Sequence, residues 1–465
     1  MEVVGRHLAR PLTETVSEWA ERCRVLSAEE SAFPGPWRND RTPYLRGMMD
    51  AMFRPGVEEI VLLKCTQIGG SEALRNIMGW IVACDPGPTM WVLPDQDSAR
   101  ATFDESLLPM LANTAALADK KTPRKWDMTR SRMRLRGMSV YGAWSGSAAQ
   151  LARRPVRYLF LDEVDKYQSW TGREAAPNRL AAERTKTYGP RRRIFQISTP
   201  TVPEGTIWQE WLSCGLQFRY HVPCPQCGKY QTLGLPRLRW PEGASAASLR
   251  ASRAVWYQCE HCDAELREGD KMEMLSRGIW LHQHQMMESG VVVGDDPLAV
   301  KVGYQITTMY SPWVPWSDVA AEFLASRDSA QNLQNFVNSW LAEPFQHRAR
   351  GASIPDEVRS KAGSAPPAGV VPEWAVILIA TADTQKDHFW WVVRAWGPHY
   401  RSQLIDYGRA ETFDDLRLAC LDTAYPASDG SPRTPTFLLI DSGGSASTSE
   451  VSRTAEVYQF AQTDP

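Results

Sequence analysis

Arg157-Tyr-Leu-Phe-Leu-Asp-Glu-Val-Asp165 is the stretch on which the interpretation of this sequence depends. Its apolar run, Tyr158 to Leu161, ends in two adjacent carboxylates, Asp162 and Glu163. Such a run is typical of a strand buried on both faces of a parallel sheet, and ligands bind at the carboxyl ends of these strands. The pair therefore suggests nucleotide hydrolysis, with Asp162 holding Mg²⁺ and Glu163 polarising the attacking water. A solvated Asp-Glu turn is the alternative, and a phosphate-binding loop upstream decides between the two.

Such a loop lies upstream in an altered form. Residues 58–72 read EEIVLLKCTQIGGSE and precede an amphipathic helix through Cys84, which is the strand, loop and helix order of a P-loop. Compared with the usual G-x-x-x-x-G-K-[ST], Gly69 and Ser71 are in register, Gly70 replaces the lysine and Lys64 replaces the first glycine. A lysine at the front of the loop can still reach the β- and γ-phosphates. Together with the downstream acids, the segment predicts ATP binding.

Two further positions are candidates with open alternatives. Tyr44 opens a helix that begins after Thr42-Pro43, where its ring could stack on adenine or pack in the core. Ser198-Thr199-Pro200 ends a strand that follows three arginines. Thr199 could sense the γ-phosphate there, or the segment could be an ordinary strand-to-turn transition.

Length and composition limit the class of protein. The 465 residues suggest roughly three domains, and 43% hydrophobic with 23% charged residues is ordinary for a globular chain. A net charge of −2 excludes a globally basic DNA-coating protein. Because no apolar run reaches the length of a membrane span and no signal core is present, we expect a cytoplasmic protein without membrane contact.

Four of the nine cysteines form two C-x-x-C pairs, Cys224 with Cys227 and Cys259 with Cys262. Two such pairs are typical of a tetrahedral Zn²⁺ site, and four thiolates leave the metal no open position. The spacing therefore predicts structural zinc rather than a catalytic metal.

Residues 348–369 mix Gly, Ala, Pro, Ser and charges without periodicity, so we interpret them as a linker. Strands are predicted beyond it over 375–380, 389–396, 402–407 and 436–440, with a helix over 412–421. This order is typical of the opening of an RNase H-like fold. Asp383 and Asp441 follow its first and fourth strands and would share divalent ions, Mg²⁺ or Mn²⁺, for two-metal cleavage.

These segments together resemble the large terminase subunits of tailed phages, the lambda-like GpA family. The resemblance rests on Lys64-x-x-Gln67-x-Gly69-x-Ser71, Tyr158–Glu163, Ser198–Pro200, Pro223–Gly228, Gly303–Trp313, Ala382–Gln385 and Leu439–Gly444. It covers about residues 30–460. That family also carries its lysine at the front of the phosphate loop.

The resemblance implies an α/β chain in which a P-loop ATPase domain of the RecA/ASCE type carries a zinc-ribbon-like insertion and precedes an RNase H-like nuclease domain. The boundaries that we predict are 1–33 for an N-terminal helical segment, 34–222 for the ATPase domain, 223–265 for the zinc-binding insertion, 266–347 for a connecting region, 348–370 for the linker and 371–465 for the nuclease domain. The resemblance places the nuclease acids on Asp383 and Asp441. It implies a third or fourth acid near the C-terminus, where Glu450 and Glu456 are weak substitutes. We therefore expect a truncated nuclease domain and little DNA cleavage by these residues alone.

The implied function is a DNA-packaging ATPase joined to an endonuclease that cuts concatemeric phage DNA. The implied partners are double-stranded DNA, the small terminase subunit, the portal of the procapsid and further copies of the chain in a ring, all in the host cytoplasm. A helicase-like or repair ATPase with a zinc module and no nuclease is the alternative. A helicase would carry motifs in a second RecA-like domain, which the C-terminal pattern lacks.

Basic residues support a DNA partner. A dense run before the acidic strand comprises Lys120, Lys121, Arg124, Lys125, Arg130, Arg132, Arg134 and Arg136. Such runs neutralise phosphates without reading sequence, or form a solvated edge balanced by acids. Arg153 and Arg154 are candidates for an arginine finger that acts in a ring of subunits.

Overall fold

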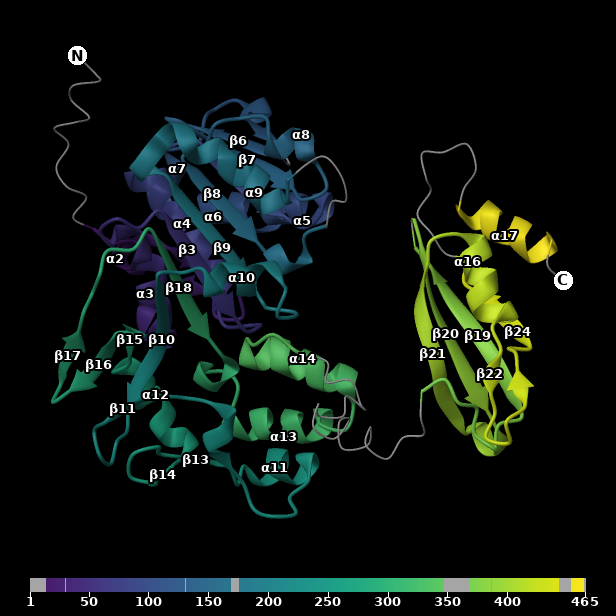
Figure 1. Cartoon of the computed structure of the whole chain (residues 1–465). Helices are drawn as coiled ribbons and strands as arrows, with labels where there is room; N and C mark the ends of the chain where they lie inside the picture. Colours follow the sequence, from purple (N-terminus) through teal and green to yellow (C-terminus); the bar gives the residue numbers. More distant parts are fainter. Residues whose placement is uncertain are drawn as a thin grey trace. The chain divides into compact units, whose positions relative to one another are not determined.

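The structure is a computed structural model that describes residues 14–29, 31–129, 131–168, 175–346, 368–385, 387–442 and 453–463. The chain folds into two compact units, Met1–His347 and Arg348–Pro465 (Figure 1). In the described part of the chain, no helix has the length and apolar character needed to cross a membrane.

An eleven-stranded mixed sheet organises the first unit, in the order β11-β10-β18-β3-β9-β8-β4-β7-β6-β5 with β15 pairing to β10. Neighbouring strands from β10 to β7 are parallel, and the strands beyond them pair antiparallel. The strands are β3 (Glu59–Lys64), β4 (Thr89–Leu93), β5 (Met128–Thr129), β6 (Arg132–Leu135), β7 (Met138–Trp144), β8 (Tyr158–Asp162), β9 (Arg193–Ser198), β10 (Leu216–Pro223), β11 (Tyr230–Thr232), β15 (Ile279–His282) and β18 (Lys301–Ile306). The acidic strand, β8, therefore lies in the parallel centre of the sheet as predicted.

Both faces of this sheet are covered, because side chains along β8 alternate between two cores. Phe160 stacks between Trp91 and Phe195 on one face, with ring centroids 4.8 and 4.9 Å apart. Leu159 and Leu161 pack into the other core. The helices of the nucleotide-binding half are α2 (Val16–Cys23), α3 (Tyr44–Asp50), α4 (Gly70–Cys84), α5 (Gln96–Ala101), α6 (Leu108–Asn113), α7 (Ala115–Ala118), α8 (Ala148–Leu151), α9 (Pro177–Ala182) and α10 (Thr206–Leu212). Helices lie on both sides of the strands in Figure 1.

The long segment between β10 and β18 builds a smaller subdomain at one end of the sheet. It contains β12 (Leu238–Arg239), β13 (Trp256–Gln258) and β14 (Glu265–Leu266), α11 (Ala246–Ser252) and α12 (Lys271–Ser276), and a separate ribbon of β16 (Gln285–Glu288) and β17 (Val291–Gly294). After β18, α13 (Trp316–Ser326) and α14 (Ala330–Leu341) return the chain to the phosphate loop. As a result β18, from far along the sequence, pairs directly with β3.

The second unit is a four-stranded sheet of order β21-β20-β19-β24. Its elements are β19 (Ile377–Thr384), β20 (Phe389–Trp396), β21 (Ser402–Ala410), α16 (Phe413–Arg417), β24 (Phe437–Ile440) and α17 (Arg453–Thr463). The first three strands form an antiparallel meander, and β24 pairs parallel to β19. Residues 348–367, most of the predicted linker, lie outside the described part, as does Glu450.

Most predicted elements are present with small shifts. The helix after the phosphate loop ends at Cys84 as predicted, and α2 begins with a capping box between Thr15 and Glu18. The first predicted C-terminal strand, 375–380, instead runs from Ile377 through Thr384. The basic run was not predicted to be a hairpin, but its later residues form β6 next to β7 at the edge of the sheet.

Candidate functional site

Lys64 and Glu163 meet at the carboxyl ends of β3 and β8, with β9 between these strands. Lys64 Nζ lies 3.3 Å from Glu163 Oε1, and Lys166 Nζ lies 2.9 Å from Glu163 Oε2. Burial raises the pKa of Glu163, but Lys64 and Lys166 outweigh it and the pKa falls below its usual value. The carboxylate is therefore ionised and held by two cations. Glu163 takes a left-handed backbone with φ of 57°, which places this side chain beside Lys64 rather than along the strand.

Two glycines explain how the lysine can stand at the front of the loop. Gly69 has φ of 86° at the N-terminus of α4, a conformation that favours glycine. A Cβ on Gly70 would lie 2.6 Å from Lys64 Cδ and 2.9 Å from Ile197 Cδ1. The missing side chain at Gly70 thus leaves the space through which Lys64 passes. Gly70 occupies the position of the usual P-loop lysine, and the side chain of Lys64 runs over it instead.

Asp162 is buried, with 7% of its surface exposed, whereas Glu163 is only partly buried. Burial is the largest cause that raises the pKa of Asp162 and Glu163 adds to the rise, whereas Lys64 and the Trp91 side chain lower it, and the resulting pKa is about 6. Its Oδ1 is buried and has no hydrogen-bond partner among the described residues. A buried carboxylate oxygen without a donor is suited to a cation or an ordered water, so the site fits Mg²⁺ on an observation independent of the sequence pattern.

The remaining predicted nucleotide contacts surround the same loop. Gln67 is exposed with φ of 53°, and Ser71 lies in the first turn of α4. Thr199 is partly buried, and its carbonyl accepts a hydrogen bond from Ser198 Oγ at 3.0 Å. These side chains lie on segments that converge at the carboxyl edge of the sheet.

Tyr44 takes the packing role of its two alternatives in this structure. It has no exposed surface, and its hydroxyl donates to the Ile68 carbonyl at 3.2 Å. Its ring contacts Tyr220 edge-on with centroids 6.2 Å apart. The side chain supports the phosphate loop, and its ring is not exposed for stacking on a base.

Asp165 joins the site to more distant segments, and the sequence pattern did not identify it. Its Oδ2 accepts hydrogen bonds from Thr201 N and Thr201 Oγ1, both at 2.9 Å, and its Oδ1 accepts from Ile207 N at 2.6 Å. Its own amide donates to Ser198 Oγ at 3.3 Å. Asp165 therefore fixes the segment after β9 relative to Glu163, two residues away. The only sequence signal was a third acid beyond the predicted pair.

The end of α14 closes this network on both sides of the loop. Asn338 Nδ2 donates to the carbonyls of Thr201 at 2.7 Å and Glu343 at 2.8 Å. The Ser339 carbonyl accepts from Thr66 N at 2.9 Å, within the phosphate loop. One helix terminus thus contacts both the loop that follows Lys64 and the segment that Asp165 holds.

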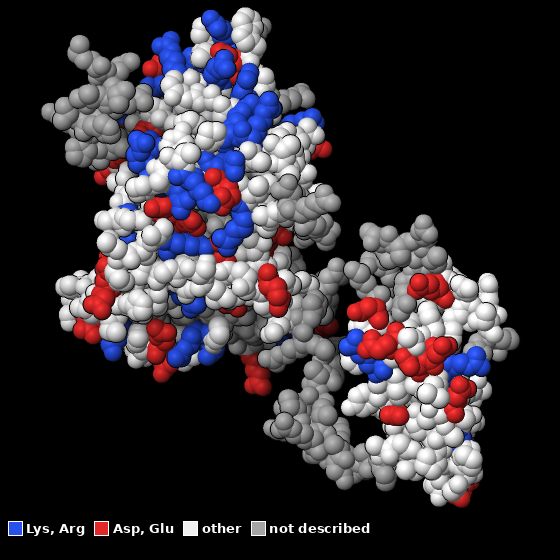
Figure 2. Space-filling view, turned by 45° about the horizontal axis from the view of Figure 1, so that its top comes forward, with Lys and Arg blue, Asp and Glu red and all other residues white. Residues whose placement is uncertain are grey.

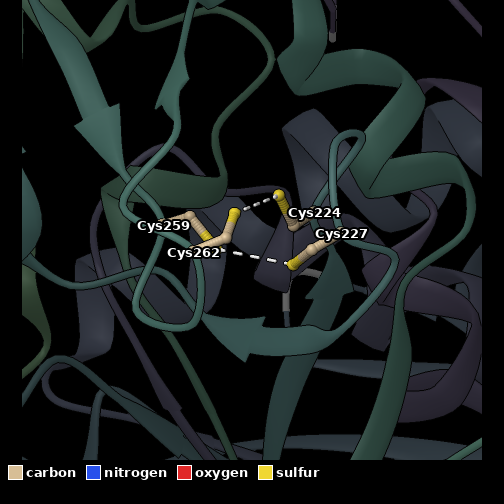
Figure 3. Close-up of side chains that lie close together, drawn as sticks. All are labelled: Cys224, Cys227, Cys259 and Cys262. Carbon is tan, nitrogen blue, oxygen red and sulfur yellow. Dashed lines mark hydrogen bonds between the residues drawn. The ribbon is translucent and has the colours of Figure 1, made fainter.

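The four predicted cysteines form a single cluster (Figure 3). Their sulfurs all lie within 4.8 Å of one another, and Cys224–Cys262 and Cys227–Cys259 are each 3.9 Å apart. A tetrahedron with Zn–S bonds of about 2.3 Å has sulfurs roughly 3.8 Å apart. The amides of Gln226 and His261 also donate to sulfurs, both at 3.4 Å. The arrangement fits a four-thiolate metal site, and the cluster could bind zinc.

The two acids of the second unit lie on neighbouring strands. Ala382 is in register with Ile440, which places Asp383 beside Asp441 at the strand ends. Asp441 Oδ1 accepts from Thr384 N at 3.1 Å, and Asp383 Oδ2 accepts from Gln385 Nε2 at 2.7 Å. Across the residues that the structure describes, the four cysteines are the only group of three or more potential metal ligands.

Other acids of this unit are engaged elsewhere. Asp406 Oδ2 accepts from the Tyr425 hydroxyl at 3.2 Å, and Asp387 contacts His388 Nδ1 at 2.7 Å. Glu456 lies on α17.

The predicted arginine-finger residues lie on a different part of the first unit. Arg153 and Arg154 follow α8 and, with Arg132 of β6, line a cavity over β7. Of the basic run, Arg134 contacts Asp127 at 3.6 Å and Lys120 contacts Asp119 at 3.8 Å, so part of it forms the balanced edge that was the alternative.

Two family models match consecutive segments of the chain, and the second match begins within the first compact unit. Residues 31–280 match the family model described as phage terminase large subunit gpA, ATPase domain, and residues 301–464 match terminase large subunit gpA, endonuclease domain. The large terminase subunit of Escherichia phage lambda is 27% identical over 463 residues, covering 94% of this chain and 70% of that protein. The large subunit of Enterobacteria phage P21 is 24% identical, covering 93% and 69%.

Solved structures of similar proteins are more distant. The large terminase of bacteriophage HK97 has 11% identity and a TM-score of 0.42, covering 88% of this chain and 71% of that chain. A large terminase from a thermophilic bacteriophage, solved in complex with ADP, has 9% identity and a TM-score of 0.34, covering 92% and 80%.

Proposed function

This chain belongs to the gpA family of phage terminase large subunits, which join an ATPase packaging motor to an endonuclease domain, and we propose the residues that carry both activities. The family membership favours the packaging motor over the helicase-like alternative. The observation that supports the residue assignment best is the meeting of Lys64, Asp162 and Glu163 beside the N-terminus of α4.

The proposed hydrolysis begins from the ion pair between Lys64 and Glu163. On ATP binding, Lys64 turns from Glu163 to the β- and γ-phosphate oxygens, while the amides from Gly69 to Ser71 face the phosphates at the helix N-terminus. Glu163, released from Lys64, accepts a proton from the water that attacks the γ-phosphate. Gln67 and Thr199 complete the phosphate surroundings. In this proposal the domain is a P-loop domain of the RecA/ASCE type.

Asp162 would hold Mg²⁺ through its buried Oδ1, which lacks a donor among the described residues. When bound, the ion would neutralise charge on the phosphates. Asp162 would be ionised in that state, because a neighbouring cation favours the charged carboxylate and opposes the effect of burial.

A charge-removing substitution tests the assignment of Glu163. Glu163→Gln should retain nucleotide binding but lower ATP turnover by about 10²- to 10⁴-fold, because the variant loses the general base. Glu183→Gln is the matched control, since Glu183 pairs with Lys186 on a helical segment away from the loop. ATP turnover in Glu163→Gln equal to that of the control would reject the assignment.

The cysteine cluster is proposed as a structural Zn²⁺ site in a zinc-ribbon-like insertion. Elemental analysis should find one Zn²⁺ per chain, and Cys224→Ser should lose both the metal and stability, because thiolate binding contributes directly to folding. Cys214→Ser, a buried cysteine outside the cluster, should keep the metal. A metal-free wild-type protein of unchanged stability would contradict the proposal.

Asp383 and Asp441 are proposed as ligands for Mg²⁺ or Mn²⁺ in an RNase H-like endonuclease domain. Asp383 lies near the end of β19 and Asp441 directly follows the parallel neighbour β24, and neither contacts a lysine or arginine among the described residues. The divalent ions would supply Lewis-acid chemistry at the scissile phosphate. The two carboxylates of this chain would bind and position those ions.

The family implies DNA, and we propose duplex DNA as the substrate of translocation. The small terminase subunit, the procapsid portal and a homo-oligomeric ring in the host cytoplasm are proposed as the setting. The domain boundaries after residues 33, 222, 265, 347 and 370 are likewise proposed.

A further inference from the structure

A second positively charged cavity lies outside the nucleotide site. It has a volume of about 180 Å³, and Met90 of β4 and residues 141–143 of β7 line it from the sheet. Its polar lining consists of Arg132, Arg153, Arg154, Gln150, Thr129 and Ser131. No aspartate or glutamate of the described residues lines it, so the cavity collects three guanidinium groups and no opposite charge.

These arginines lack the ion pairs that most charged side chains of this unit have. None of the three forms an ion pair with a carboxylate in the described ranges, whereas Arg134, two residues along from Arg132, pairs with Asp127. Arg132 Nε is buried and has no hydrogen-bond partner there either. Arginine stays protonated under all ordinary conditions, so the three charges repel one another until an anion enters.

The cavity suits a phosphate group in particular. Arg154 stacks over the Tyr141 ring with its guanidinium carbon 4.2 Å from the centroid. A stacked guanidinium keeps its in-plane N–H groups free, and this planar fork matches the oxygens of a phosphate. The Gln150 amide and the Ser131 hydroxyl are neutral groups suited to further phosphate oxygens, whereas the Thr129 hydroxyl donates to the Arg132 carbonyl at 3.2 Å.

The position separates this cavity from the nucleotide of the same chain. Met90 is in register with Leu159 of β8, three residues before Asp162. Three residues of strand span roughly 10 Å, and β7 lies a further strand away from β8, beyond β4. The arginines therefore face the middle of the sheet rather than its carboxyl edge.

We propose that Arg132, Arg153 and Arg154 form a binding site for a backbone phosphate of duplex DNA. The proposal rests on the proposed DNA substrate but not on the assignment of the ATP-site residues. A phosphodiester is the anion that the family's DNA partner supplies repeatedly along its length, and contacts to backbone phosphates hold a duplex independently of sequence.

Anisotropy of a fluorescein-labelled blunt duplex, titrated with full-length protein at several salt concentrations, tests the site. The triple variant Arg132→Gln, Arg153→Gln, Arg154→Gln should bind the duplex at least tenfold more weakly. The slope of log K against log salt should fall by about 1 for each phosphate that the variant no longer neutralises. Arg250→Gln, which removes a paired surface arginine on α11, should leave both quantities unchanged.

Two further measurements keep the result decisive. Affinity for a fluorescent ADP analogue reports the fold of the nucleotide half and should be unchanged in the triple variant. The single variant Arg153→Gln, at an exposed position, should reproduce part of the DNA effect without disturbing packing. Wild-type duplex affinity and salt slope in the triple variant would overturn the proposal.

A neighbouring subunit's nucleotide is the other source of phosphate. Mixing the triple variant with Glu163→Gln chains tests it, because subunits that supply arginines in trans would restore ATP turnover to the mixture. Restored turnover together with unchanged DNA affinity would overturn the DNA assignment. Unrestored turnover together with weakened DNA binding supports it. Failure of the wild type to bind any duplex would instead refute the proposed DNA substrate.

Discussion

The chain places a pair of carboxylates at the strand ends of two different sheets, and their surroundings are opposite. Asp162 is buried and Glu163 is held by two lysines. Asp383 is exposed, and the polar contacts of Asp383 and Asp441 come from an amide side chain and a backbone N–H. Lys and Arg gather over the first unit, whereas acids gather on the visible face of the second (Figure 2). Among the described residues, lysines lie beside the first pair, whereas no lysine or arginine contacts the second.

Substitution of Asp162 should have the largest effect on activity and stability. Asp162→Asn should lower ATP turnover by at least 100-fold, because the proposed Mg²⁺ ligand is removed, and yet should stabilise the metal-free protein. The folded pKa of about 6 lies above the usual 3.8, so the folded state binds the proton more tightly and ionisation of Asp162 costs stability as pH rises. The gain should be on the order of 3 kcal/mol at pH 7.5 and about half as much at pH 5.

Urea unfolding of wild type and Asp162→Asn at the two pH values, in chelator, gives this difference. Asp383→Asn, at an exposed carboxylate, is the control and should change stability by less than about 0.5 kcal/mol at either pH. A variant no more stable than wild type at pH 7.5 would show that burial of Asp162 carries no ionisation cost.

The second pair should respond to divalent ions. Two neighbouring carboxylates repel each other until a cation lies between them. Millimolar Mn²⁺ should therefore raise the unfolding temperature of the C-terminal unit by a few degrees in full-length protein, and Asp383→Ala or Asp441→Ala should remove most of that increase. Asp387→Ala, whose carboxylate contacts His388, should keep it. A Mn²⁺ response that survives both active substitutions would place the ion elsewhere.

Substitution of Asn338 should have the smallest effect on ATP turnover. This residue belongs to a hydrogen-bond network that, among the described residues, only the first pair of acids has. The first pair is linked through Asp165 and Thr201 to the end of α14, whereas the side-chain hydrogen bonds of the second pair join only the neighbouring ends of β19 and β24 in the described part of the chain. Asn338→Ala removes two hydrogen bonds, each worth about 1 kcal/mol, and should slow ATP turnover several-fold with little change in nucleotide affinity. Asn332→Ala, exposed on the same helix, should have no effect. Equal turnover in the two variants would mean that α14 does not position the site.

Features that depend on residues close together in the sequence were predicted correctly. The apolar run of β8, the helix from Gly70 to Cys84 and the paired cysteines all follow from neighbours in sequence. The acids and Lys64 were predicted to lie together because parallel strands end at one edge of the sheet. The sequence showed that Gly70 replaces the usual lysine. It did not show that the Lys64 side chain runs over Gly70, because that depends on the packing of Ile197 against the same position.

Long-range packing explains what the sequence did not reveal. The pairing of β18 with β3 brings α14 against the phosphate loop, and sequence periodicity cannot predict this contact between distant segments. Tyr44 could stack or pack by sequence alone, and Tyr220, far along the chain, decides for packing. The arginines of β6 and of the segment after α8 belong to one cavity only because β7 lies beneath both.

The central claim is that Lys64, from the front of the loop, performs the work of the usual P-loop lysine. The most direct measurement is ATP affinity and turnover of Lys64→Ala beside Lys166→Ala, which removes the other, more exposed cation on Glu163. Lys64→Ala should lower turnover by about 10²-fold or more and weaken ATP binding, whereas Lys166→Ala should change both by only a few-fold. Equal effects of the two substitutions, or ATP binding and turnover that persist without Lys64, would contradict the claim.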